Sequence, residues 1–479
     1  MAEGSTREQR ERELKFDVPD TWALPELTGL VAADGSVQRE TVQLQSSYYD
    51  TADWDLLHAR ITLRRRTGDA DTGWQLKVPD GDARTEIRLP LGGRGVPEPL
   101  RTITLGVRAG AALKPIAMVR TERAVHRLVD AKDTALAELV VDDVTATQYG
   151  EAAVIRTWRE VEVELVAGDE RLLSRTARWL GETGARPSAS ESKLARALDI
   201  GARQPPETRD LGGLIRSYLD AQYQQILSGD LDLRREHNVI HPTRVATRRY
   251  RSVLRVFATV LDSERAARLD VELKWFASAL GEVRDRQVLR AHLDEILADL
   301  PPELVLGPVR TRIDQTLTRE QQHGVAELER VMRSRRYLAL LRELREWSLR
   351  PPITANAPAA QVTTFLDRAE RKVRRRLKVA RHSADRDVAT HRARKAAKRA
   401  RYTAELSEPT LGRVARKRAK QAKKIQQRLG DRQDRVVAAA FLRRIGAAAG
   451  TTPGENGFTF GLLYERELEL ARRVDRQVR

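Results

Sequence analysis

Short runs between residues 1 and 166 alternate apolar with polar or charged side chains, which is the two-residue period of β-strands. Turn-forming residues such as Gly68, Gly73 and Pro79 separate these runs. The pattern predicts an N-terminal domain built of short antiparallel strands. The clearest runs are 61–66, 74–78, 84–89, 135–144 and 157–166.

The pattern changes near residue 210 to long stretches rich in Arg, Ala, Leu and Glu, which favour helices. The segment 200–210 contains two prolines and polar residues, so we interpret it as a linker. We therefore predict an α+β protein of two domains, with an all-α domain following the strands. The expected bounds are 8–200 and 208–479.

The helical half contains an internal repeat. Residues 241–251 align with 391–401 at a spacing of 150, and 280–288 align with 429–437 at 149. A proline-rich break at 351–361 lies between the copies. The sequence thus predicts two related helical bundles, 208–350 and 362–479.

Composition narrows the chemistry that is open to this chain. Its 479 residues include no cysteine, which excludes disulfides, thiolate metal sites and cysteine nucleophiles. No apolar run approaches the ~20 residues that cross a bilayer. The charged N-terminus lacks the apolar stretch of a secretory signal, so we expect no membrane association and a cytoplasmic location.

The charge is divided unevenly. Residues 1–200 carry 28 basic and 33 acidic side chains, whereas residues 201–479 carry 58 basic and 35 acidic ones. A cationic half of this size binds polyanions at low salt, whether nucleic acid, a phosphate polymer or anionic lipid. The positive charge indicates a polyanionic partner, but it does not distinguish nucleic acid, a phosphate polymer and anionic lipid.

Charged residues two apart project from the same face of a strand. A single such strand is most simply a solvated outer face over an apolar inner one. Here some strands cluster carboxylates and others cluster Arg and Lys, so a closed barrel could turn both sets onto one lumen. Oxygen ligands for Mg²⁺ or Mn²⁺ beside cationic clamps suit a bound phosphate chain.

The N-terminal half resembles the CYTH family, the triphosphate tunnel metalloenzymes. The resemblance begins with E-x-E-x-K at residues 11–15 and continues through six further blocks, as far as about residue 200. It implies an eight-stranded antiparallel tunnel that hydrolyses a triphosphate with a divalent metal. The blocks are 48–66, 74–79, 119–123, 138–144, 158–165 and 192–198.

The CYTH resemblance also implies roles for residues. Glu11, Glu13 and Lys15 would be catalytic. Asp142 and Asp143 are adjacent, and which of them faces inward stays open. The implied metal ligands are Glu11, Glu13, Glu138, Asp142, Glu162 and Glu164. The triphosphate would be held by Arg64, Arg66, Lys77, Arg88, Arg120 and Lys193.

Each copy of the helical repeat predicts a cationic ridge. His241, Arg244, Arg248, Arg251 and Arg255 lie within roughly 80° on a helical wheel. A solvated charged face would mix acids with bases, yet acids are almost absent from both ridges. Cations without neighbouring acids favour a polyanion ligand. Its binding should tighten as pH falls, because the two ridge histidines become charged.

The helical half is similar to the CHAD family over about residues 208–475, on motifs such as H-x-x-R-x-x-x-R-R-x-R at 241–251. The resemblance implies two pseudosymmetric helical bundles with a basic cleft for inorganic polyphosphate. The candidate polyphosphate-binding residues are His241, Arg244, Arg248, Arg249, Arg251, Lys274, Arg284, Arg336, His391, Arg394, Lys395, Lys398, Arg399, Arg401 and Tyr402.

These features predict a polyphosphate-binding protein whose tunnel hydrolyses a triphosphate or ATP under Mg²⁺ or Mn²⁺, with polyphosphate granules as a candidate location. The alternative is a binding and targeting protein whose tunnel only senses a nucleotide or triphosphate. A nucleic-acid binder ranks lower, because aromatics make up 5% and no sequence-reading motif is present. Adenylate cyclase activity, which the CYTH family includes, ranks low because no adenine-reading site is identified.

Overall fold

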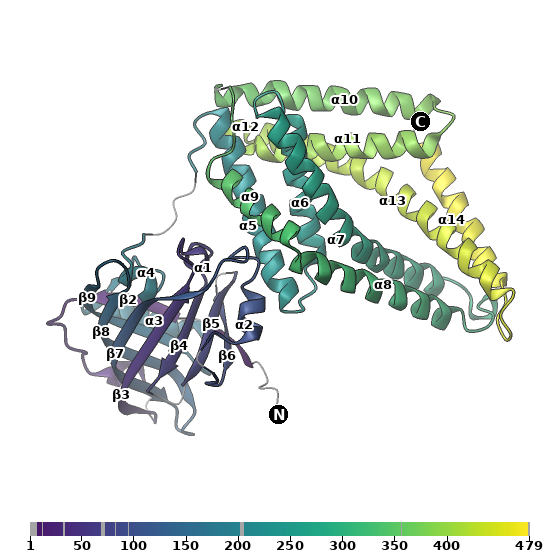
Figure 1. Cartoon of the computed structure of the whole chain (residues 1–479). Coiled ribbons are helices and arrows are strands. Elements are labelled where there is room, and N and C mark those ends of the chain that lie inside the picture. The colour runs from purple at the N-terminus through teal and green to yellow at the C-terminus, as the bar shows by residue number, and fades with distance from the viewer. Residues whose placement is uncertain are drawn as a thin grey trace. The chain divides into compact units, whose positions relative to one another are not determined.

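The computed structural model describes residues 7–11, 13–31, 34–68, 72–81, 83–93, 95–201, 206–355 and 357–477. The chain divides into two compact units, 1–204 and 205–479 (Figure 1). The first unit is an antiparallel sheet with short helices, and the second is entirely helical. The predicted α+β architecture of two domains is therefore confirmed.

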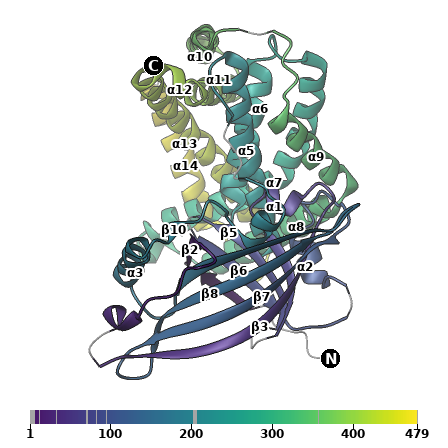
Figure 2. The ribbon, with the colours of Figure 1, turned by 90° about the vertical axis from the view of Figure 1, so that its left-hand side faces the viewer.

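The strands of the first unit form one antiparallel sheet in the order β1-β6-β5-β4-β3-β7-β8-β9-β2-β10. Long strands β3, β7 and β8 run side by side (Figure 2). The strands are β1 (Arg7–Glu11), β2 (Glu13–Val18), β3 (Ser36–Asp50), β4 (Thr62–Thr67), β5 (Gly73–Asp80), β6 (Ala83–Leu89), β7 (Lys114–Val129), β8 (Ala135–Gln148), β9 (Val154–Leu165) and β10 (Arg186–Pro187).

The sheet closes on itself. One residue separates β1 from β2 along the chain, yet β1 pairs with β6 and β2 pairs with β9 at opposite ends of the strand order. The CYTH resemblance implied eight strands, and ten are assigned in the part of the sheet that the structure describes. The segments on either side of residue 12 are counted as β1 and β2, and β10 is a two-residue addition beside β2.

The apolar core of this unit lies partly outside the sheet. Phe16, Leu139 and Val163 are buried against Leu172 and Leu180 of α3 (Glu170–Glu182). Since alternate residues face opposite sides of a strand, this arrangement turns the intervening charged residues inward. The remaining helices of this unit are η1 (Leu27–Leu30), α1 (Asp55–His58), α2 (Glu98–Ile103) and α4 (Lys193–Ala197).

The second unit consists of antiparallel helix pairs. Among its described residues no strand is assigned, and isolated bridges join only short segments. Its helices are α5 (Leu211–Arg234), α6 (Ile240–Val256), α7 (Ser263–Ala298), η2 (Pro302–Leu304), α8 (Val309–Arg333), α9 (Arg335–Leu349), η3 (Ala359–Gln361), α10 (Val362–His382), α11 (Arg386–Leu406), α12 (Glu408–Leu411), α13 (Arg413–Ala449) and α14 (Phe458–Gln477).

Helix bounds recur at a spacing close to 150 residues. Helix α7 starts at Ser263 and α13 at Arg413, and both are more than 35 residues long. The expected duplication would pair α5 with α10, α6 with α11 and α8 with α14 in the same way. Helix α9 has no counterpart at this spacing among the described residues.

Small residues let neighbouring helices of the second unit approach closely. Ala396, Ala397 and Ala400 of α11 are buried against Val373 of α10 and Ala422 of α13. Alanine has a small side chain, so the backbones of the three helices pack closely. This packing fixes where the cationic side chains of α11 begin.

Candidate functional site

The interior of the sheet is lined by charged side chains brought together by strand pairing. On one wall, Glu13 of β2 lies opposite Glu164 of β9, and Glu164 lies opposite Glu138 of β8. Two residues along each strand, Lys15 lies opposite Glu162. Carboxylates directly across a strand pair repel each other, so this wall requires cations nearby.

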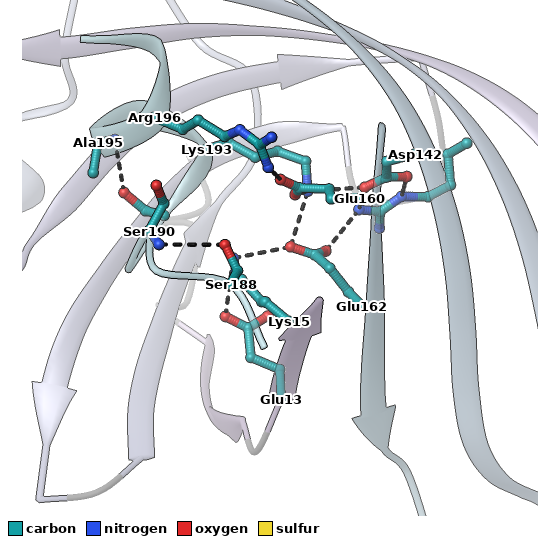
Figure 3. A network of polar contacts seen from close by, with 12 residues as sticks. Glu13, Lys15, Asp142, Glu160, Glu162, Ser188, Ser190, Lys193, Ala195 and Arg196 are labelled. Atoms are coloured by element: carbon teal, nitrogen blue, oxygen red, sulfur yellow. Dashed lines mark hydrogen bonds and ion pairs between the residues drawn. The ribbon is translucent and has the colours of Figure 1, made fainter. Parts of the chain in front are cut away.

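Lys193 supplies one of these cations. It is the first residue of α4, and its side chain is only 6% exposed. Its Nζ atom lies 2.8 Å from Asp142, 2.5 Å from Glu160 and 2.9 Å from Glu162 (Figure 3). Burial lowers the pKa of Lys193, but the three carboxylates outweigh this and raise it. The lysine is thus charged and bound to all three acids.

Arg123 and Lys15 complete the ion-pair network. Arg123 donates to both oxygens of Asp142, at 2.8 and 2.7 Å, and to Glu162 at 3.0 Å. The Lys15 Nζ atom lies 2.9 Å from Glu162 and 3.4 Å from Glu13. Burial raises the pKa of Glu13, but Lys15 and Lys77 outweigh burial and lower the pKa to about 2. Neighbouring cations also lower the pKa values of Asp142 and Glu162, so these two carboxylates and Glu13 are ionised at neutral pH.

The opposite wall is mainly cationic. Arg64 of β4 donates to Gln75 at 2.6 Å and to the Tyr48 hydroxyl at 3.2 Å, and lies 3.9 Å from Glu86. The enclosed cavity of about 90 Å³ is small because these side chains fill it. Its charged lining residues are Glu13, Lys15, Arg64, Arg66, Lys77, Arg84, Glu86, Arg88, Arg123, Glu138, Glu162, Glu164 and Lys193.

Most of the predicted tunnel residues lie around this cavity. The exceptions are Arg120, which is exposed on β7, Glu11, whose side chain lies outside the described residues, and Asp142, which pairs with Lys193 but does not line the cavity. Three positions further along β7, Arg123 faces inward instead, because residues two apart share a face and residues three apart do not. Asp142 faces inward and is fully buried, whereas Asp143 is exposed and pairs with Arg159.

Sequence reasoning missed two members of the network. Glu160 shares its strand face with Glu162 and Glu164, and this parity could have identified it. Arg123 follows Glu122 in the block 119–123, and only the register of β7 with β8 places it opposite Asp142. These two residues, together with Lys193, hold the buried acids in place.

The acidic residues could hold a divalent cation. Asp142, Glu160 and Glu162 each offer an oxygen within 4.8 Å of the other two. Carboxylate oxygens are the ligands that Mg²⁺ and Mn²⁺ favour, so the donor set fits such an ion. The Lys193 ammonium now occupies this position, so an ion bound there would have to displace it. Glu13 and Glu164 lie in the next row of the same wall.

The helical unit contains a second charged site. A cleft of about 560 Å³ lies between α6, α7 and α11. Nine of the predicted binding residues line it: Arg244, Arg248, Arg251, Lys274, His391, Lys395, Lys398, Arg399 and Tyr402. Arg255 of α6 also lines the cleft.

The other predicted residues of this unit do not line the cleft. Arg249 and Arg401 both pair with Glu405, at 2.8 Å each, and lie over the Tyr402 ring. Arg336 is paired with Glu272 at 2.7 Å. The remaining three are His241, Arg284 and Arg394.

Acidic side chains reach the ridges from neighbouring helices. Asp270 of α7 lies 3.0 Å from Arg251 and also pairs with Arg255, which the sequence of the ridge alone did not indicate. Arg244 pairs with Asp285 at 3.0 Å. The α6 ridge is therefore partly neutralised, and the expectation of unrelieved cations is wrong for these three arginines.

The two copies share one local arrangement. The Arg244 guanidinium lies over Gly281 and pairs with Asp285, while the Arg394 guanidinium lies over Gly430, 3.8 Å from Asp434. A side chain larger than hydrogen at either glycine would crowd the guanidinium above it. Both glycines therefore let an arginine lie flat against the next helix.

Cations on α11 remain poorly compensated. Burial lowers the pKa of Lys398, and Arg248, Arg394 and Arg244 lower it further, to about 7. Burial and nearby cations also lower the pKa values of His391 and Lys395. Crowding of like charge on this scale is relieved by an anion.

Comparisons with known proteins agree with the division of the chain. Residues 9–198 match the CYTH domain model, and residues 217–443 match the CHAD domain model. An uncharacterized protein of Mycobacterium tuberculosis, Rv2226, is 38% identical over 98% of this chain and 94% of its own length. No helix of the described chain has both the length and the apolar character needed to cross a membrane.

Two solved structures are similar as well. PptA from Streptomyces chartreusis has a TM-score of 0.48 and 21% identity, and covers 56% of this chain and 99% of its own. The CHAD domain from the plant Ricinus communis has a TM-score of 0.45 and 23% identity, and covers 58% of this chain and 95% of its own. The family matches and the relative over nearly the whole chain show that this protein belongs to the CYTH-CHAD family, with an N-terminal CYTH domain and a C-terminal CHAD domain.

Proposed function

We propose that this chain binds inorganic polyphosphate in its CHAD domain and hydrolyses a triphosphate in its CYTH domain. One observation carries the proposal most directly. Among the described residues, eight cationic and five carboxylate side chains line the tunnel cavity, and the buried Asp142 and Glu160 pair with Lys193 of that lining. A site for a metal ion alone would not need an excess of cations, whereas a metal-bound phosphate chain would.

In the proposed reaction the cationic wall binds the phosphate oxygens. Arg64, Arg66 and Lys77 would neutralise the charge that spreads over the transferred phosphoryl group. Bound Mg²⁺ or Mn²⁺ would supply charge neutralisation and lower the pKa of water. Ionised Glu13 would accept a hydrogen bond from the attacking water and orient it.

Ligand binding would replace the internal ion pairs of the tunnel. Lys15 and Lys193 now compensate the carboxylates, and the cavity between the walls is small. A metal ion would take over that compensation and release both lysines toward phosphate oxygens. The ion-pair network is then the arrangement of the empty tunnel. When substrate and metal bind, the metal takes the place of the lysines at the carboxylates, and the lysines pair with phosphate oxygens.

The decisive experiment measures phosphate release from tripolyphosphate and from ATP, with Mg²⁺, with Mn²⁺ and with chelator. The chain should release phosphate only with metal, and Glu13→Ala should reduce the rate by at least about 100-fold. Glu122→Ala, which removes an exposed glutamate of the same domain, should leave it unchanged. Release that persists in Glu13→Ala would contradict the assigned role.

The alternative is a tunnel that binds without turnover. The buried ion pairs of Lys193 with three carboxylates favour this alternative, because a metal ion must break them before it can bind. Calorimetry separates the two functions, since heat of triphosphate binding without phosphate release from either substrate would establish a sensor. Polyphosphate binding by the cleft would be retained in both cases.

A further inference from the structure

Helix α10 carries a strip of cationic side chains that are not among the residues lining the cleft. Lys372, Arg375 and Arg376 lie on one flank of this helix, about 60–160° from Val373 on a helical wheel. Val373 is buried against α11, so the flank begins where the two helices meet. Figure 1 shows α10 lying along α11 over much of its length.

The two flanks of α10 differ in charge. Asp367 and Glu370 occupy the flank toward α13, where Arg418 pairs with them at 2.8 and 3.6 Å. The flank with Lys372, Arg375 and Arg376 carries no acid, and no ion pair joins these three to any described residue. A solvated helix face normally mixes both signs, as the α13 side does.

Arg399 connects this flank to the cleft. It lines the cleft with Arg251 and Lys395, and it lies near enough to Arg376 and Lys372 of α10 for their charges to act on one another. Burial lowers the pKa of Arg399, and cations from both sides, Arg255, Arg251 and Arg376, lower it further. The pKa of Lys372 is lowered by its burial, by Arg399 and by its neighbours on α10. The cleft and the flank therefore share one positive field.

The corresponding helix of the first copy lacks this charge. Between Arg216 and Arg234, α5 has no Lys or Arg, and it carries Asp220, Asp230 and Asp232. The cationic flank is therefore absent where the repeat would place it. The cleft is extended on the α10 side and not on the α5 side.

We propose that Lys372, Arg375 and Arg376 form a second binding segment, over which a long polyphosphate chain continues after it leaves the cleft past Arg399. The inference rests on the proposed polyphosphate binding and adds the path that a long chain takes when it leaves the cleft. Short chains fill the cleft alone, while longer chains also occupy α10. Affinity should then grow with chain length because of contacts outside the cleft.

The test compares two triple variants of the full chain with equal loss of charge. Lys372→Gln, Arg375→Gln and Arg376→Gln together remove the proposed segment. Arg371→Gln, Arg374→Gln and Lys378→Gln remove three exposed cations from the remainder of the same helix. Circular dichroism and thermal unfolding check that both variants keep the fold.

Affinity is measured for tripolyphosphate and for long-chain polyphosphate as a function of salt. The first variant should weaken long-chain binding by about tenfold or more, and lower the slope of log affinity against log salt by about 2 to 3. Its affinity for tripolyphosphate should stay unchanged. The control variant should alter the slope by less than about 1.

Several outcomes would overturn the inference. Equal weakening by both variants would show a general effect of net charge, and equal losses for short and long chains would place these residues in the cleft. Loss of duplex DNA binding with long-chain polyphosphate binding intact would make α10 a nucleic-acid surface. If the unaltered chain binds neither polyphosphate, the proposed function fails first, so the two failures are distinguishable.

Discussion

At the scale of single residues, this protein balances buried charge with buried charge. Lys193, Asp142 and Glu160 are nearly inaccessible to water, and the Lys193 ammonium pairs with both carboxylates. Such a network contributes little net stability when complete, yet breaking it leaves a buried charge without a partner. The consequences of a substitution therefore depend on which charge it removes.

Lys193→Met should destabilise the CYTH domain by about 3–5 kcal/mol, because three buried carboxylates would lose their shared cation. Mg²⁺ or Mn²⁺ should restore part of that loss, since the oxygens are then free to bind the ion. Chemical denaturation with and without metal measures both effects. Lys114→Met, at an exposed position of β7, should change neither. A variant that unfolds like the unaltered chain would refute the compensating role of Lys193.

Lys398 should make polyphosphate binding dependent on pH near neutrality. Its pKa of about 7 in the free cleft reflects burial and the arginines at 248, 394 and 244, with Asp434 acting in the opposite direction. A bound polyanion raises that pKa, so binding takes up a proton and affinity should rise, by up to about tenfold per pH unit, as pH falls from 8 to 6. Binding titrations across that range measure the slope.

Lys398→Arg should flatten this dependence, because arginine stays protonated. His391→Gln should leave most of it, because burial and nearby cations lower the pKa of His391 and so move its titration to lower pH. A flat profile in the unaltered chain would contradict the assignment to Lys398. A steep profile that disappears only in the histidine variant would transfer the effect to His391.

At the scale of elements, close helix packing is set by small residues at particular contacts. Gly229 of α5 lies against Thr243 of α6, and a Cβ atom there would come within 2.0 Å of the Thr243 hydroxyl. Thr243 is fully buried, so neither helix can move aside without disturbing the core. This contact determines the separation of α5 and α6, and with it the position of the α6 ridge.

Gly229→Ala should reduce the free energy of unfolding by about 1–3 kcal/mol, because the added methyl group overpacks this contact. Gly461→Ala in α14, where no atom lies within 4 Å of the new Cβ, should raise it by up to about 1 kcal/mol through helix propensity. Thermal unfolding of both variants distinguishes the two effects. Equal shifts of the same sign would show that packing at Gly229 is not the cause.

At the scale of the whole molecule, a CHAD domain and a CYTH domain occupy one chain. With polyphosphate bound as proposed, tethering would raise the local concentration of polymer ends near the tunnel, to roughly the millimolar range. The benefit applies only to substrates long enough to contact both sites. Tripolyphosphate, which one site accommodates, should gain nothing from the tether.

Arg248→Gln with Lys398→Gln should therefore raise the KM for long-chain polyphosphate by about tenfold while kcat stays constant. The kinetic constants for tripolyphosphate should not change. Arg374→Gln with Lys378→Gln, which removes equal charge outside the cleft, serves as the matched control. Equal effects on both substrates would show that the CHAD domain acts on the tunnel in some other way.

Sequence patterns determined the features that depend on neighbouring residues. The alternation in 158–165 indicated a strand with glutamates on one face, and those glutamates at 162 and 164 line the cavity. The spacing of His391 and Lys398 likewise placed both on one ridge of a helix, and both line the cleft, whereas Arg394 and Arg401 of the same ridge do not. Such periodicity is a local property of the backbone, so the chain order alone reveals it.

Only the tertiary structure decided how these faces meet. The register of β7 with β8 places Arg123 on Asp142 and leaves Arg120 exposed, and closure of the sheet brings Lys193 among acids from two strands. Likewise, Asp270 of α7 neutralises two arginines of α6. These contacts join segments that lie far apart in sequence, and strand register and helix packing, which no local pattern encodes, determine them.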